Sequence, residues 1–155
     1  MQIRVFMGMR RRAREIALQV LYQLDASQGK PQEVLDLFWE NFKPSLQARE
    51  FCHRLVEGVC QNLGQIDRLI EDNSENWTLK RMAVVDRNIL RLATFELLHC
   101  PDIPFKAILN EAIELAKKFG ADDSGAFING ILDKIHSLSL ADGKEHPKNP
   151  VRPVF

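Results

Sequence analysis

Apolar residues recur at every third or fourth position along almost the whole chain, which is the period of an α-helix rather than of a strand. Between Arg10 and Ser27, for example, Ile16, Val20 and Leu24 fall on one face of a helix. This spacing, together with the glycine and proline residues that interrupt it, predicts about seven helices. They cover about 10–27, 31–42, 44–63, 66–73, 82–99, 105–119 and 125–137.

Three glycines have expected structural roles. Gly64 directly follows the third predicted helix, and we expect it to end that helix. Gly120 directly follows the sixth predicted helix, where a residue in the left-handed conformation commonly ends a helix, so we expect it to be the C′ residue. The pair Asn129-Gly130 would suit a hairpin between strands, but apolar residues at helical spacing surround it. We therefore expect Gly130 to be a close-packing point inside the last helix, at a cost of about 1 kcal/mol relative to alanine.

The composition is that of one globular domain without a membrane segment. The chain has 155 residues, of which 45% are hydrophobic and 27% charged, so it can close a core without disulfides or a metal. No run approaches the roughly 18 uninterrupted apolar residues of a membrane span, and the N-terminus lacks the order of a secretory signal. We expect a cytoplasmic protein with a flexible extension over 1–8, an all-helical domain over 9–139 and a flexible tail over 140–155.

The cysteines give no sign of a disulfide or a metal site. Cys52 and Cys60 fall in one predicted helix, where their backbones would lie roughly 12 Å apart, too far for a disulfide. With Cys100 the count is odd, and no pair has the Cys-x-x-Cys spacing. We expect all three to be buried free thiols.

Charge is distributed unevenly, although 21 basic and 21 acidic residues cancel overall. Residues 1–14 contain five arginines and no acidic residue, so the rest of the chain has an excess of five acidic residues. The zero net charge excludes a protein that binds polyanions through its overall charge. The basic end indicates a local anion-binding patch, and an exposed, frayed terminus is the alternative that charge leaves open.

The first predicted helix turns several arginines away from its apolar face. Arg11, Arg12 and Tyr22 fall opposite that face, while Arg10 and Arg14 flank it. Guanidinium groups bind phosphates and stack on bases, and an exposed tyrosine adds a stacking or partner-contact surface. Because cations at a helix N-terminus oppose the helix dipole, we interpret these arginines as functional. The pattern favours single-stranded RNA, and an ordinary cationic helix face or an acidic protein partner is the alternative.

The turn before the last predicted helix is a second candidate surface. Its backbone N–H groups can bind phosphate, although capping of the helix by Asp123 or Ser124 also explains the polar residues there. Phe127 lies at the margin of the apolar stripe, so its ring is either part of the core or exposed for stacking on a base. We include Lys118, at the end of the preceding helix, among the candidate RNA-binding residues.

An enzymatic function has one candidate motif. Glu50 with His53, and Glu96 with His99, have the Glu-x-x-His spacing of di-iron sites in four-helix carboxylate proteins. All ligands of such a site project into the bundle, but Glu50 and His53, with Arg54, fall on a face of their helix that we expect to be solvated. Phe51 and Leu55 lie on the opposite, apolar face, where we expect core residues. Glu96 falls among apolar residues, where we expect a partly buried carboxylate with a hydrogen-bonding partner. We favour a non-enzymatic protein without metal or cofactor, and a di-iron helical-bundle enzyme is the alternative from another class.

Three segments between about residues 10 and 136 are informative together: RRRAREIALQVLYQLD, VVDRNILRLATFELL and IPFKAILNEAIELAKKFGADDSGAFINGILDKI. In their order and spacing they resemble the NusB family of bacterial transcription antitermination factors. The resemblance implies an all-α, single-domain bundle of two packed helical subdomains without catalytic activity or cofactor. It implies binding to boxA-type RNA on nascent ribosomal RNA transcripts together with the ribosomal protein NusE, in an antitermination complex with RNA polymerase. A homodimer is possible under this resemblance. A NusB-like module serving ribosomal RNA modification is the alternative function, although no methyltransferase segment follows residue 139.

The resemblance also assigns roles to individual residues. Phe127 matches an aromatic residue at the RNA surface, and Asp123 matches an acid in a turn that is tied to antitermination. Tyr22 and Asp86 match positions on the NusE side. The candidate RNA-binding residues are Arg10, Arg11, Arg12, Arg14, Lys118, Asp123, Ser124 and Phe127. The family usually has lysine or a similar polar residue at Gly125-Ala126, so fewer polar contacts are expected beside Phe127.

Overall fold

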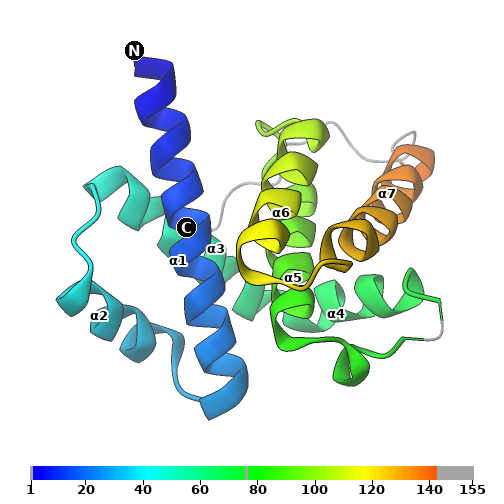
Figure 1. Ribbon diagram of the computed structural model, residues 1–155, viewed down its shortest axis with the longest axis horizontal. Helices are drawn as coiled ribbons and strands as arrows, with labels where there is room; N and C mark the ends of the chain where they lie inside the picture. Colours follow the sequence, from blue (N-terminus) through cyan, green and yellow to red (C-terminus); the bar gives the residue numbers. More distant parts are fainter. Residues whose placement is uncertain (1, 76, 143–155) are drawn as a thin grey trace. The chain divides into compact units, whose positions relative to one another are not determined.

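The computed structural model describes residues 2–75 and 77–142, which are helical apart from short connections (Figure 1). Seven α-helices and one short 3-10 helix account for the secondary structure of these residues, which contain no strand. The chain divides into two compact units that meet in the sequence between Gln61 and Asn62. The predicted all-α fold, with about seven helices in two helical subdomains, is confirmed. None of the described helices is both long and apolar enough to cross a membrane.

The first unit consists of α1 (Gln2–Ser27), α2 (Pro31–Asn41) and α3 (Leu46–Gln61), with α1 packed mainly along α3 (Figure 1). The predicted apolar stripe of α1 is buried, because its spacing of three and four residues keeps it on the side that faces the other helices. The core of this unit is formed by Ala13, Ile16, Ala17, Val20, Leu21, Val34, Leu35, Trp39, Cys52, Leu55, Val56 and Val59.

The cysteines are free thiols, as expected, but only two of them are buried. Cys52 and Cys100 are buried, whereas Cys60 is half-buried. Burial in the apolar core raises the pKa of the Cys52 thiol to about 12. This thiol is therefore uncharged near neutral pH and serves as a small apolar core residue.

Three helices extend beyond their predicted ends. α1 begins at Gln2 rather than at Arg10, α4 (Leu63–Asp72) begins at Leu63 rather than at 66, and α7 (Ser124–Asp142) ends at Asp142 rather than near Ser137. These predicted boundaries are wrong, because a formed helix gains a backbone hydrogen bond with each added residue and can continue beyond the periodic apolar stripe that predicted it. Of the predicted tail over 140–155, residues 143–155 lie outside the described part of the chain.

The second unit is built around α5 (Val84–His99), which packs against α4 (Leu63–Asp72), α6 (Phe105–Phe119) and α7 (Figure 1). A 3-10 helix, η1 (Leu79–Arg81), precedes α5. A helix with neighbours on several sides must be apolar around most of its circumference. The buried apolar residues of α5 are Ile89, Leu90, Leu92, Ala93 and Phe95.

A bidentate ion pair joins α4 to α5 on the polar margin of the second unit. Arg91 Nε donates to Asp67 Oδ1 at 2.8 Å, and Arg91 Nη2 donates to Asp67 Oδ2 at 3.0 Å. Arg91 Nη1 also donates to Asn88 Oδ1 at 3.1 Å. Both charged side chains are largely shielded from solvent, so their parallel hydrogen bonds fix the position of α4 along α5.

The structure corrects the expected roles of three glycines. Gly120 has φ −96° and ψ −172°, so it is not a left-handed C′ residue. A Cβ atom at this position would lie 2.8 Å from Ala116 O and 2.8 Å from Ser124 Oγ, so close approach explains the glycine. Gly130 is not a close-packing point, because a Cβ there would have no neighbour within 4 Å. Gly64 lies in the first turn of α4, and the break before it falls at Asn62.

Candidate nucleic-acid interface

The predicted arginine segment lies on α1, but its members differ in exposure. Arg11 and Arg12 are exposed, and Arg10 is half-buried. The side chain of Arg14 is buried, with the residue only 5% exposed. Arg10 and Arg14 therefore both flank the apolar face, as interpreted from the sequence. Arg14 is buried too deeply to contact a ligand directly from solvent.

Phe51 of α3 holds two of these arginines in place. The guanidinium carbon of Arg10 lies 5.1 Å from the centroid of the Phe51 ring, and that of Arg14 lies 5.3 Å from it. Both distances are within the range of a cation–π interaction. The ring therefore anchors cationic side chains, and it is half-buried rather than part of the closed core that the sequence pattern suggested.

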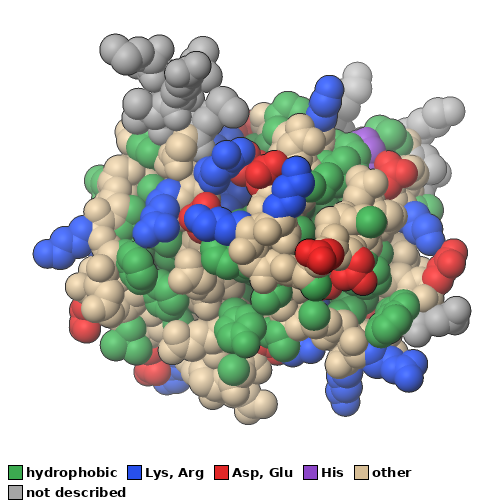
Figure 2. Space-filling model, in the orientation of Figure 1, with side chains coloured by type: hydrophobic (Ala, Val, Ile, Leu, Met, Phe, Trp, Pro, Cys, Tyr) green, Lys and Arg blue, Asp and Glu red, His purple; other side chains and the backbone are tan. Residues whose placement is uncertain are grey.

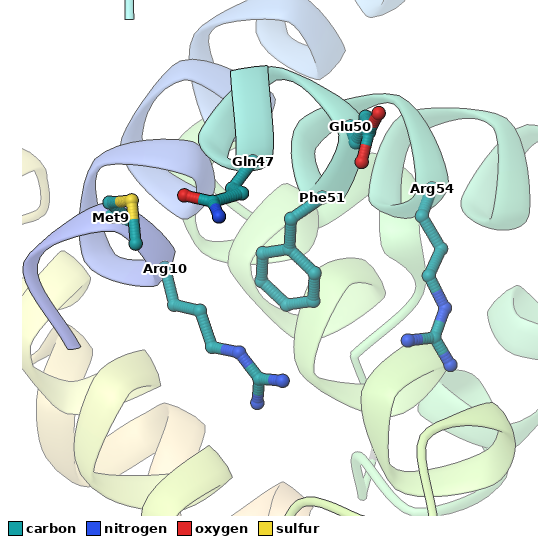
Figure 3. A pocket seen from close by; sticks show the side chains of 6 residues that line it. All are labelled: Met9, Arg10, Gln47, Glu50, Phe51 and Arg54. Atoms are coloured by element: carbon teal, nitrogen blue, oxygen red, sulfur yellow. The ribbon is translucent and has the colours of Figure 1, made fainter. Parts of the chain in front are cut away.

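A pocket of about 250 Å³ opens beside this ring in the first unit (Figure 3). Arg10 and Arg54 extend on either side of Phe51, and Gln47 and Glu50 lie along the rim of the pocket (Figure 3). Two guanidinium groups beside an aromatic ring are suited to a phosphate group or a planar base. Sequence reasoning missed Arg54, because it placed this residue on a solvated face of α3.

Arg12 is held by a second aromatic ring. Its guanidinium carbon lies 5.4 Å from the centroid of Phe42, and its Nη1 lies 3.5 Å from Glu15 Oε2. On the face drawn in Figure 2, basic side chains gather over the middle of α1, with acidic atoms among them. Tyr22 is 48% exposed on the same helix, as the sequence predicted. The first unit thus contains a basic helix whose arginines contact aromatic rings.

In the second unit, Phe127 is neither fully buried nor free of contacts. It is half-buried and makes a T-shaped contact with Trp77, with 6.5 Å between the ring centroids. Trp77 is 51% exposed, and both rings line a pocket of about 310 Å³ that also includes Asp123. Sequence reasoning missed Trp77, although a lone tryptophan in a polar segment outside the apolar periodicity was a usable signal.

The turn before α7 is held by the buried Ser124. Its Oγ accepts a hydrogen bond from the backbone N–H of Ala121 at 2.9 Å, and its own N–H donates to Ala121 O at 3.1 Å. Asp123 and Lys118 are exposed, and the backbone carbonyl of Asp123 accepts from Phe127 N at 3.2 Å. Ser124 therefore shapes the turn, whereas Asp123 and Lys118 present charge to solvent.

The di-iron motif is not assembled. His53 Nε2 accepts a hydrogen bond from Trp39 Nε1 at 2.9 Å, so this nitrogen is occupied, and Glu50 is exposed. The expectation of a solvated face is wrong for His53, because α2 covers it and the two rings stack at 5.6 Å. Glu96 is only 2% exposed, so it is more deeply buried than the expected partly buried carboxylate. Within the described residues, no three His, Cys, Asp or Glu side chains form a group that could hold a metal ion.

The fold is that of a small all-α protein, with a basic helix in one unit and an aromatic pocket in the other. A model of the NusB family matches residues 11–137. The chain belongs to the NusB family.

Individual relatives span nearly the whole chain. The transcription antitermination protein NusB of Desulfatibacillum aliphaticivorans is 53% identical over 139 residues, which cover 90% of this chain and 95% of that protein. The NusB protein of Geotalea daltonii is 54% identical over 144 residues, covering 88% and 99% respectively.

Solved structures agree in fold. NusB from T. maritima has a TM-score of 0.78 at 41% identity, covering 83% of this chain and 90% of that chain. A crystal structure of the antitermination factors NusB and NusE in complex with double-stranded RNA has a TM-score of 0.78 at 30% identity. That likeness covers 85% of this chain and 98% of that NusB chain.

Proposed function

We propose that this chain is a transcription antitermination factor that binds boxA-type RNA on nascent ribosomal RNA transcripts, together with NusE and as part of a complex with RNA polymerase. The observation that carries the proposal is the basic helix α1, whose arginines are exposed or rest on the rings of Phe51 and Phe42. The related NusB, which was solved in complex with NusE and double-stranded RNA, supports NusE and RNA as the classes of partner. We infer that the chain acts in the cytoplasm and catalyses no reaction.

The proposed RNA contacts divide by exposure. Arg11 and Arg12 bind phosphates directly, and Arg10 adds a contact at the edge of the pocket beside Phe51. Arg14 is buried, so its role is to orient Phe51 and to raise the local positive potential. A guanidinium that is already held against a ring loses less side-chain freedom when it binds, which favours affinity.

The second unit contributes contacts of a different kind. Phe127 offers a ring for base stacking, Lys118 offers a cation for a phosphate, and Asp123 offers hydrogen-bond acceptors to base edges. Ser124 supports these residues by fixing the turn from within. Tyr22, which is exposed on α1, and Asp86 of α5 are the proposed contacts with NusE.

A binding titration tests the proposal. A boxA-type RNA and a scrambled RNA of the same composition are titrated with and without NusE. We expect tighter binding of the boxA-type RNA, and a further gain when NusE is present. The same RNA annealed to its complement serves as a competitor, and it should compete less well, because paired bases are not available for stacking on exposed rings.

Two results would contradict the proposal. Equal affinities for the boxA-type and scrambled RNAs in the presence of NusE would reduce the arginine helix to a nonspecific anion-binding surface. Failure of the chain to associate with NusE, by calorimetry or gel filtration, would remove the partner from the proposal.

A further inference from the structure

The outward face of α2 takes no part in the proposed contacts with RNA or NusE. α2 packs on α1 and α3, and its buried residues are Val34, Leu35 and Trp39. Large apolar side chains nevertheless stay uncovered on α2 and just beyond it. Leu37 is 51% exposed, and Leu46, the first residue of α3, is 70% exposed. Neighbouring exposed apolar side chains are typical of a surface that contacts a partner.

Two phenylalanine rings lie between these leucines in the sequence and are held in place. Phe38 is half-buried and stacks on Phe42, with 5.9 Å between the ring centroids and 22° between the planes. Phe42 is the C-cap residue of α2 and is 37% exposed, and its backbone N–H donates to Phe38 O at 2.8 Å. We call Leu37, Phe38, Phe42 and Leu46 the α2 patch. Because its rings are already ordered, a partner that covers the patch immobilises little that was free.

A hydrogen bond to α3 fixes the position of α2 itself. Trp39 Nε1 donates to His53 Nε2 at 2.9 Å, and the guanidinium carbon of Arg49 lies 5.1 Å from the centroid of the Trp39 ring. Both contacts involve the buried Trp39, so they hold the helix without covering its outward face. A partner that binds α2 therefore finds a fixed surface and does not have to order the helix.

Three exposed carboxylates surround Leu37 on the outward face of α2. Glu33, Asp36 and Glu40 fall on the same side of the helix as Leu37, at the spacing of three and four residues that defines one face. α2 contains no basic residue. Asp36 Oδ1 accepts from Gln32 Nε2 at 2.8 Å, a neutral donor, and none of the three carboxylates forms an ion pair within the described part of the chain. Figure 2 shows hydrophobic and acidic atoms side by side over α2, at the lower left of the view.

The charge of this face decides which kind of partner it fits. Three carboxylates repel the phosphates of an RNA strand and the headgroups of an anionic bilayer. A protein segment that carries lysine or arginine side chains around an apolar side chain complements both the carboxylates and the α2 patch. Lys30 and Lys43 lie just beyond the two ends of α2, so the cations of such a segment are favoured along the middle of the helix.

We propose that the outward face of α2 docks a basic, amphipathic segment of a further protein in the RNA polymerase complex. An apolar side chain of that segment covers Leu37 and the α2 patch, and its lysines or arginines pair with Glu33, Asp36 and Glu40. This face points away from α1, which carries Tyr22, so the proposed contacts with NusE stay free when the segment is bound. The inference rests on the proposed function for the setting of the contact, and it adds a third partner to RNA and NusE.

Photo-crosslinking within the assembled complex tests the inference. The full chain, with p-benzoylphenylalanine in place of Leu37, is assembled with NusE, boxA-type RNA and RNA polymerase with its elongation factors. We expect crosslinks to a protein segment rich in lysine and arginine, identified by mass spectrometry of the crosslinked peptides. The matched control carries the same residue in place of Leu140, which is 64% exposed on α7, and it should not crosslink to that segment.

A synthetic peptide of the crosslinked segment gives a second, quantitative readout. Glu33→Gln/Glu40→Gln should weaken its binding to the full chain about 2- to 30-fold, because two exposed ion pairs contribute that much. Asp72→Asn/Asp133→Asn removes the same charge from exposed positions of the second unit and should leave the peptide affinity unchanged. Both double variants should keep the affinities for boxA-type RNA and NusE, since no proposed contact with either involves these four carboxylates.

Several outcomes would overturn the inference while leaving the proposed function intact. Crosslinks from position 37 only to RNA, only to NusE or only to a second copy of this chain would assign the face to another occupant, and crosslinks to no protein would leave it an ordinary solvated surface. Equal peptide affinities of the two double variants would remove the carboxylates from the contact. Binding to boxA-type RNA and NusE is measured on the same samples, so its loss in the unaltered chain would instead contradict the proposed function. The double variants change only exposed side chains, so they decide the question even if the chain altered at Leu37 fails to fold.

Discussion

At the scale of single residues, aromatic rings determine how the arginines of α1 are presented. Arg10 and Arg14 lie against Phe51, and Arg12 lies against Phe42. A ring attracts the guanidinium group through its electron-rich face and restricts its rotamers without neutralising its charge. The ring contacts therefore leave the guanidinium charge in place, although Arg12 also pairs with Glu15, with Nη1 at 3.5 Å from Oε2.

Gly120 and Gly130 provide a matched pair for testing close packing. In Gly120→Ala the new Cβ would meet Ala116 O and Ser124 Oγ, each at 2.8 Å. The first of these atoms belongs to the backbone and cannot move away, so the turn that carries Asp123 must shift. We expect a loss of about 1–3 kcal/mol in the free energy of unfolding, measured by urea denaturation.

The opposite sign is expected for Gly130→Ala. This glycine is exposed inside α7, and a Cβ there would have no neighbour within 4 Å. Alanine has the higher helix propensity, so the variant should gain about 0.5–1 kcal/mol in the free energy of unfolding. A loss of stability in Gly130→Ala, or no change in Gly120→Ala, would contradict the packing described for these positions.

At the scale of elements, apolar periodicity predicted the helices that pack, and it failed where packing does not set the boundary. The sixth helix was predicted at 105–119, as α6 is found, because its ends are marked by Pro104 and Gly120. The start of α1 was missed by several residues, since a formed helix can extend beyond the periodic apolar stripe from which it is predicted. The spacing of apolar residues indicates which part of a helix packs against the core, and it does not indicate where the helix ends beyond that part.

The pocket beside Trp77 illustrates what sequence reasoning could not assemble. Phe127, Asp123 and Asp86 were each identified singly, from a stripe margin, a turn and a family resemblance. Their grouping with Trp77 depends on how α5, η1 and the turn before α7 approach one another. Proximity between residues so far apart in the sequence leaves no periodic signal, so the structure was needed to bring them together.

The ion pair between α4 and α5 should stabilise the second unit measurably. Asp67→Asn removes one charge and weakens both hydrogen bonds from Arg91, which is only 12% exposed in its side chain. We expect a loss of about 1–3 kcal/mol in the free energy of unfolding, because a largely shielded guanidinium loses its counterion. Asp133→Asn, with an exposed carboxylate, should change stability by less than about 0.5 kcal/mol.

A double-mutant cycle separates this pair from general effects of charge. If the pair interacts as described, Asp67→Asn combined with Arg91→Gln should cost less than the sum of the two single changes. Additive losses would show that the two side chains contribute independently, and α4 would then depend on its apolar face alone.

At the scale of the whole molecule, RNA binding depends on where the charged residues lie rather than on the net charge. Basic and acidic residues cancel at 21 each, so no long-range field from net charge draws RNA to the protein. Binding must therefore come from the local potential of α1. The salt dependence of RNA binding reports this directly, since each phosphate that is bound releases counterions from the strand.

The double variant Arg11→Ala/Arg12→Ala should accordingly reduce the slope of log affinity against log salt by about 0.7 for each phosphate that the protein no longer neutralises. Lys30→Ala/Arg68→Ala removes the same charge from exposed positions outside α1, and we expect its slope to match that of the unaltered chain. If both variants reduced the slope equally, binding would follow net charge and the basic helix would have no special part in it. A reduction confined to the first variant would show that the bound phosphates contact α1. Salt screens both pairs of charges alike, so only phosphates bound to α1 can make the slopes of the two variants differ.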